Sequence, residues 1–154
     1  MSEGKRFLDK CTSTDVERNP WPHQIIENTL SENVFLKLKN QCEEKLKDKT
    51  DKLIHILPHQ YKEYGIDFYD ETLDICENLL ENVKDLCKQY PTVRQYPNLG
   101  VNAHISITPP LPYKFYIHQE GLEKIWSSVT YVTPDVNVGT KMYTAQNEKA
   151  FVKE

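Results

Sequence analysis

The spacing of apolar residues changes past the middle of this chain, and that change limits the folds it can adopt. Before Pro91, two segments carry apolar residues three and four positions apart, which is the period of an amphipathic helix. After Pro91, short segments alternate apolar with polar residues and are separated by prolines and glycines, which is typical of strands joined by turns. Helices followed by consecutive strands predict an α+β fold, in which the helices pack on an antiparallel sandwich or barrel.

Both helices have boundaries that the sequence marks. The first is predicted over about Ser31 to Lys47, because Ser31 is a suitable N-cap and Glu32 places a negative charge in the first turn. The second is predicted from its cap at Asp70 to the stop at Pro91. The first apolar stripe is formed by Val34, Phe35, Leu38, Cys42 and Leu46, and the second by Leu73, Cys76, Leu80, Val83, Cys87 and Tyr90.

The chain divides into a polar beginning and one domain. Residues 1–19 lack apolar periodicity, so we predict a flexible leader there. Residues 20–154 are predicted to form a single domain, with a helical part over about 20–91 and a β part over about 92–154. Four consecutive strands after Pro91 are too few to complete a two-sheet jelly roll, so we expect the domain to be truncated at its C-terminus. Strands are predicted at residues 23–28, 101–108, 113–118, 124–132 and 140–144.

Charge and apolar content exclude several classes of function. The 19 basic and 23 acidic residues give a net charge of −4, so the chain lacks the basic surface on which nucleic acids and anionic membranes bind. No apolar stretch approaches the roughly 20 residues of a membrane span, and the first residues lack the apolar core of a signal peptide. We therefore expect a cytoplasmic protein with free cysteines that binds neither nucleic acid nor membrane. The open strand edges of an incomplete sheet are expected to favour self-association.

The pair His118 and Glu120 is the sharpest candidate for chemistry. Residues two apart on a strand face the same side, so this pair presents one imidazole and one carboxylate to a common position at the end of a predicted strand. Two histidines and one carboxylate on one face of an octahedron hold iron(II) and leave positions open for a co-substrate and oxygen. The same spacing also occurs by chance on protein surfaces. The residues around the pair are therefore needed to distinguish a metal site from a chance occurrence.

Those residues resemble the 2-oxoglutarate/iron(II)-dependent oxygenase superfamily, above all its prolyl-hydroxylase-type members and their relatives in bacteria and phages. The resemblance is carried by Tyr113–Glu120, Lys124–Pro134 and Asn137–Tyr143. These match an aromatic residue ahead of H-x-D or H-x-E, a loop, a strand, a polar turn, and a glycine before the next strand. The resemblance implies a jelly-roll (double-stranded β-helix) sheet covered by the N-terminal helices. It also implies hydroxylation of an unidentified substrate with iron(II) and the co-substrate 2-oxoglutarate.

The resemblance implies individual roles as well. His118 and Glu120 match the first two iron ligands, with glutamate in place of the commoner aspartate. Phe115 matches the aromatic residue three positions before the first ligand. Tyr131 matches a tyrosine that contacts the carboxylate of 2-oxoglutarate in some relatives, and Gly139 matches the turn into the next core strand.

Other parts of the family pattern are missing. The family's distal histidine and the basic residue that pairs with the far carboxylate of 2-oxoglutarate lie further toward the C-terminus, and nothing after Tyr143 matches them. We therefore expect this chain to bind iron poorly and to be inactive as an enzyme. His104, on the preceding strand, could complete the site, but a half-buried strand histidine with a hydrogen-bond partner is the favoured interpretation. His55 is assigned to a loop beside Pro58.

Two other functions stay open. The chain could be an inactive jelly-roll module with a binding or structural role, which the glutamate and the missing ligands favour. It could also be a small interaction protein of helices and sheet in which His118 and Glu120 stand together by chance. In that case, replacing both residues by alanine would leave the metal affinity unchanged.

Overall fold

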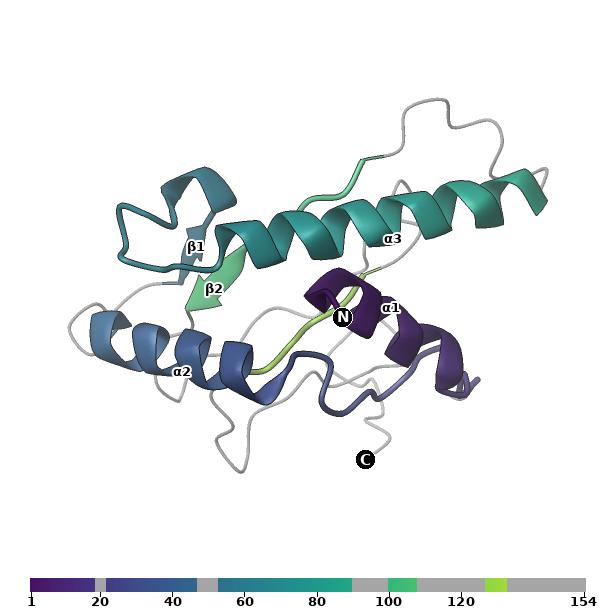
Figure 1. The fold of residues 1–154 in the computed structure, drawn as a ribbon, viewed down its shortest axis with the longest axis horizontal. Coiled ribbons are helices and arrows are strands. Elements are labelled where there is room, and N and C mark those ends of the chain that lie inside the picture. The colour runs from purple at the N-terminus through teal and green to yellow at the C-terminus, as the bar shows by residue number, and fades with distance from the viewer. Residues whose placement is uncertain (19–21, 47–52, 90–99, 108–126, 133–154) are drawn as a thin grey trace, which may run out of the picture.

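The computed structural model describes residues 1–18, 22–46, 53–89, 100–107 and 127–132. Figure 1 shows a pair of strands between α2 (Glu32–Leu46) and the beginning of α3 (Tyr69–Gln89), with α1 (Glu3–Ser13) lying against α3. The described residues thus form a mixed arrangement of helices and a small antiparallel sheet, which agrees with the predicted α+β class. One of the two strands, Ile54–Ile56, lies within the part of the chain predicted to be helical. The elements in chain order are α1 (Glu3–Ser13), α2 (Glu32–Leu46), β1 (Ile54–Ile56), the short 3-10 helix η1 (Pro58–Gln60), α3 (Tyr69–Gln89) and β2 (Ile105–Ile107).

The two strands pair antiparallel and place alternate residues on two faces. Because side chains alternate along a strand, the isoleucines face the interior while His55 and Ser106 are exposed on the other face. One face of the pair is therefore apolar and covered, and the other is polar and open to solvent. The register joins Ile54 with Ile107, His55 with Ser106, and Ile56 with Ile105.

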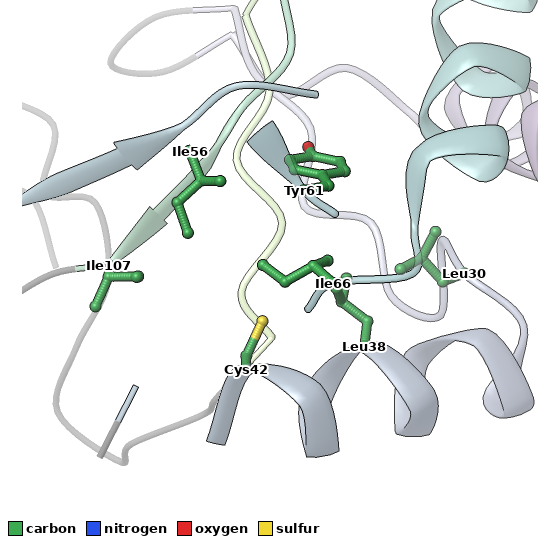
Figure 2. Packing of buried hydrophobic residues seen from close by; sticks show 7 residues of the cluster. All are labelled: Leu30, Leu38, Cys42, Ile56, Tyr61, Ile66 and Ile107. Carbon is green, nitrogen blue, oxygen red and sulfur yellow. The ribbon is translucent and has the colours of Figure 1, made fainter. Parts of the chain in front are cut away.

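One cluster of buried residues lies beneath the strand pair. Leu38 and Cys42 rise from α2 toward Ile66, and Tyr61 and Ile56 lie on the other side of that residue (Figure 2). Helix and strands share this core, so removing their apolar surface from water stabilises both together. The side chains on the polar outer face of the strands are therefore attached to backbone that is packed against a buried core. The cluster comprises Leu30, Leu38, Cys42, Ile56, Tyr61, Ile66 and Ile107.

The two helices predicted from apolar spacing are confirmed as α2 and α3. The N–H of Phe35 donates to the carbonyl of Ser31 at 2.9 Å, so helical hydrogen bonding begins at the predicted cap. α3 begins at Tyr69, so Asp70 lies in its first turn rather than at the predicted cap, and the helix ends at Gln89, shortly before Pro91. A proline disfavours helical backbone in the residue before it, which accounts for this end.

The prediction of a flexible leader over residues 1–19 is wrong for most of that range, because Glu3–Ser13 forms α1. The side chain of Ser2 caps the helix by accepting a hydrogen bond from a first-turn N–H at 3.2 Å. The buried residues of α1 are Gly4 and Phe7, which are three positions apart. Glycine has no apolar side chain, so the buried face of this helix shows no stripe of apolar residues in the sequence, and the helix was not predicted.

Two carboxylates tie α1 to the other helices. Asp74 of α3 accepts a hydrogen bond from the N–H of Gly4 at 2.6 Å. That N–H lies in the first turn, where no helical carbonyl can reach it. Glu3 in turn accepts a hydrogen bond from the N–H of Ser31 at 2.8 Å, at the start of α2. The N-terminal helix therefore connects α2 with α3.

The strand predicted over residues 23–28 is absent. His23 makes a single antiparallel bridge to Glu17, and Ile25, the centre of the predicted strand, is 73% exposed. Asn28 has a φ of 56°, in the left-handed region, and this ends the extended backbone. Neighbouring apolar residues give a local preference for extended backbone, but a strand also needs a partner along its length.

The predicted strands after Pro91 have mixed outcomes. The one predicted over residues 101–108 is confirmed in shorter form as β2. Residues 127–132, the described part of the strand predicted over 124–132, are irregular. Residues 127–130 are all exposed there, so their β-forming side chains gain no burial that would favour a strand. The strands predicted over 113–118 and 140–144 lie outside the described residues.

Candidate functional site

The residues implied in iron binding fall outside the described part of the chain. His118 and Glu120 lie between residues 108 and 126, and so does Phe115. Tyr131 is described, in the irregular segment 127–132, and is 47% exposed. A small molecule arriving from solvent can therefore reach the ring of Tyr131, as contact with a co-substrate would require.

Two histidines far apart in the sequence meet on the outer side of the strand pair. His55, His104 and Ser106 are all exposed there, and we call these three residues the histidine face. The ring centroids of the two histidines are 4.8 Å apart and their planes cross at 89°, an edge-to-face contact. The strand register explains the meeting, because His55 pairs with Ser106 and His104 stands diagonally, two residues earlier on the same side.

A hydrogen bond fixes one of the two rings. Nδ1 of His55 and Oγ of Ser106 are 2.9 Å apart. When Nδ1 carries the proton and donates to the hydroxyl, Nε2 presents a lone pair; when the hydroxyl donates instead, Nε2 carries the proton. In the first form, His55 can act as a metal ligand through Nε2.

The histidine face corrects two interpretations made from the sequence. His55 lies in β1 rather than in a loop, and His104 is exposed rather than half-buried. The signal that could have found the pair is alternation with isoleucine, because Ile54 and Ile56 flank His55, and Ile105 and Ile107 follow His104 at alternate positions. The pattern is short in each segment, and α3 lies between the two in sequence. The pairing of the two segments could therefore not be predicted from the sequence.

Within the described ranges, no three or more histidine, cysteine or acidic side chains converge where they could hold a metal ion. The histidine face supplies two imidazoles, so a metal ion bound there would complete its coordination with water or other oxygen ligands. Two imidazoles suit zinc, copper and nickel better than magnesium or calcium, which prefer oxygen.

The ionisable groups in the core are held in their neutral forms. Burial raises the pKa of the Cys42 thiol above its ordinary value of 9.0, and the nearby Glu43 adds to the rise. Burial likewise raises the pKa of the Tyr61 hydroxyl, and a hydrogen bond with Thr72 offsets part of that rise. A thiol with a raised pKa is a poor nucleophile, so Cys42 serves packing rather than catalysis.

We expect Cys42 to resist alkylation in the folded chain. It is 3% exposed, whereas Cys11 is partly exposed, and burial raises the pKa of both thiols. In the folded chain, iodoacetamide should label Cys42 at less than about one-tenth of the rate of Cys11, as measured by peptide mass spectrometry. In urea, the two cysteines should be labelled at equal rates. Equal rates in the folded chain would show that the core around α2 is open.

The same burial predicts a loss of stability at alkaline pH. The pKa of Cys42 is higher in the folded chain than in the unfolded chain, because burial disfavours the thiolate. Its contribution to stability is therefore full below the unfolded pKa and is lost as pH rises through the raised folded value.

Comparisons of the chain with known proteins were negative. No family model matches it, no curated protein matches it, and no solved structure matches it. Among the helices that the structure describes, none combines the length and the apolar content needed to cross a membrane.

Proposed function

We propose that this chain is a domain of the iron(II), 2-oxoglutarate-dependent oxygenase type, in which His118 and Glu120 are two of the iron ligands. The observation that carries the proposal is the resemblance of Tyr113–Glu120, and of the segments after it, to the pattern of that superfamily. The described fold supports the proposal in outline, because a jelly roll with covering helices also needs helices packed on antiparallel strands. β2 directly precedes the segment that carries the pair.

The pair offers a donor set that suits iron(II). One imidazole nitrogen and one carboxylate oxygen are two-thirds of the two-histidine, one-carboxylate set of non-haem iron oxygenases. Glu120 has one methylene more than the commoner aspartate, so its carboxylate reaches the same position from a slightly more distant backbone. No histidine follows His118 in the sequence, so the proposal assigns two of the three ligands of that set. When bound, the metal and 2-oxoglutarate would activate dioxygen, which is the oxidant: one oxygen atom goes to the substrate C–H bond and the other to succinate, with release of carbon dioxide.

Three residues of the chain have separate tasks in this proposal. His118 and Glu120 would hold the metal ion through an imidazole nitrogen and a carboxylate oxygen. Tyr131 donates a hydrogen bond from its hydroxyl to a carboxylate oxygen of 2-oxoglutarate and so orients the co-substrate. Its exposure of 47% leaves the ring within reach of a ligand that enters from solvent.

The proposal is tested by anaerobic titration with iron(II), with and without 2-oxoglutarate, followed by the weak visible absorption of the ternary chelate. We expect a weak band, because two protein ligands hold iron less tightly than three. His118→Ala should remove the band. His59→Ala should leave it unchanged, because His59 is an exposed histidine on η1 without a role in the proposed site. A band that survives both His118→Ala and Glu120→Ala would contradict the proposal, and tight binding would show that these residues already complete the site.

An inactive jelly-roll module is the second candidate, and the glutamate at position 120 is the observation that favours it. Glu120→Asp separates the two candidates. In an oxygenase-type site, the commoner ligand should strengthen the iron chelate, whereas a metal-free module should show no band with either residue. Absence of the band with both glutamate and aspartate at position 120 would favour the inactive binding module.

A further inference from the structure

We propose that His55 and His104 form a binding site for a divalent transition-metal ion of the zinc, nickel and copper class, separate from the iron pair. The two rings project from the outer side of the strand pair and meet with their centroids 4.8 Å apart. Both side chains are exposed, so an ion can approach from solvent without opening the core. This proposal goes beyond the oxygenase function and uses different residues.

The separation of the rings suits a shared metal ion. Two imidazoles that ligate one zinc ion, each at roughly 2.0–2.1 Å from nitrogen to metal in a tetrahedral arrangement, have ring centroids about 5 Å apart. The observed 4.8 Å is close to that value. The edge-to-face contact does not yet aim both nitrogens at one point, so the ring that presents its face has to turn about χ2. Exposed side chains change rotamer readily. The backbone of His55 is held in β1, and His104 directly precedes β2.

Ser106 supplies the second feature of a metal site. A ligating histidine almost always donates its other ring N–H to a neighbouring oxygen, which fixes the tautomer and the direction of the ring. Nδ1 of His55 already lies 2.9 Å from Oγ of Ser106, on the residue that pairs with His55 across the strands. With the N–H donating to that hydroxyl, Nε2 is the ligating atom.

The alternative is that the two rings only pack against each other. Cross-strand pairs of this kind stabilise a sheet modestly, by about 0.2–1 kcal/mol. Phenylalanine keeps the ring contact but offers no ligand, so substitution by phenylalanine separates packing from metal binding. In the packing interpretation, His104→Phe keeps whatever nickel affinity the chain has.

Nickel titration by calorimetry in a non-coordinating buffer tests the proposal, with the protein's melting temperature as a second readout. Nickel is the probe because imidazole suits it, whereas thiolates also select zinc and copper(I). We expect one nickel ion to bind and to raise the melting temperature, since a ligand that binds only the folded state stabilises it. His55→Phe and His104→Phe should each weaken binding more than about tenfold, and Ser106→Ala by up to about tenfold.

Two controls decide whether the binding belongs to this site. His59→Ala and His118→Ala should both leave the nickel affinity of the histidine face unchanged, because neither residue belongs to it. Wild-type affinity in both phenylalanine variants would overturn the proposal. Loss of all nickel binding in His118→Ala alone would also overturn it, because the metal would then belong to the iron pair. Failure of the iron titration leaves these expectations unchanged.

Discussion

Ile56→Ala should lower the free energy of unfolding by about 2–5 kcal/mol, the usual loss when a buried isoleucine is truncated. Ile56 has no exposed surface and is the last residue of β1, in the cluster that joins the strands to α2. The shorter side chain loses its transfer free energy and leaves a cavity that the neighbouring side chains fill incompletely. Urea denaturation followed by far-ultraviolet circular dichroism measures the change.

Ile25→Ala is the matched control, because it removes the same atoms from a residue that is 73% exposed. Its effect should stay within about 0.5 kcal/mol. Similar losses at the two positions would contradict the described core, since the difference between them depends on burial alone. A large loss at Ile25 alone would instead indicate that residues 23–28 are covered.

Gly4→Ala should destabilise the chain by about 1–3 kcal/mol, the usual cost of forcing an extra methyl group into a packed interface. A Cβ at this position would meet the backbone carbonyl of Asp74 and would lie 2.5 Å from Nδ2 of Asn78. The carbonyl belongs to the backbone of α3 and cannot swing aside. The hydrogen bond from the N–H of Gly4 to the Asp74 carboxylate would be strained as well.

The sign of this change is informative. In an undocked helix, alanine is favoured over glycine by up to about 1 kcal/mol, so a loose α1 would gain stability from the same substitution. Gly100→Ala is the control, because a Cβ there meets nothing within 4 Å. Thermal unfolding of the two variants should show a clear fall for Gly4→Ala and little change for Gly100→Ala. A stabilised Gly4→Ala chain would mean that α1 does not pack on α3.

Sequence patterns predicted the elements whose apolar spacing and ends can be recognised within the segment itself. α2 and α3 show apolar residues at helical spacing and recognisable ends, and both were found where expected. α1 escaped prediction because one of its buried residues is Gly4, and because the carboxylate that holds it belongs to Asp74, 70 positions away. Such a contact leaves no periodic trace in the sequence.

The two candidate sites also differ in whether they could be predicted from local sequence. The pair His118 and Glu120 could be proposed from sequence, because both ligands lie within three residues and the surrounding motif is local. The histidine face could not, because it depends on the register between β1 and β2. Only that register brings His104 beside His55, and each strand is three residues long, too short to specify its partner by pattern.

The strand pair has a consequence for the order of folding. His55 and Ser106 are 51 positions apart, and the whole of α3 lies in the loop that their pairing closes. Closing such a loop costs chain entropy before any contact compensates, so local helices should form early and the strand pair late. A partly folded chain can then contain α2 and α3 while its two histidines are still distant from each other. The histidine face would therefore report completion of the fold, rather than the presence of secondary structure.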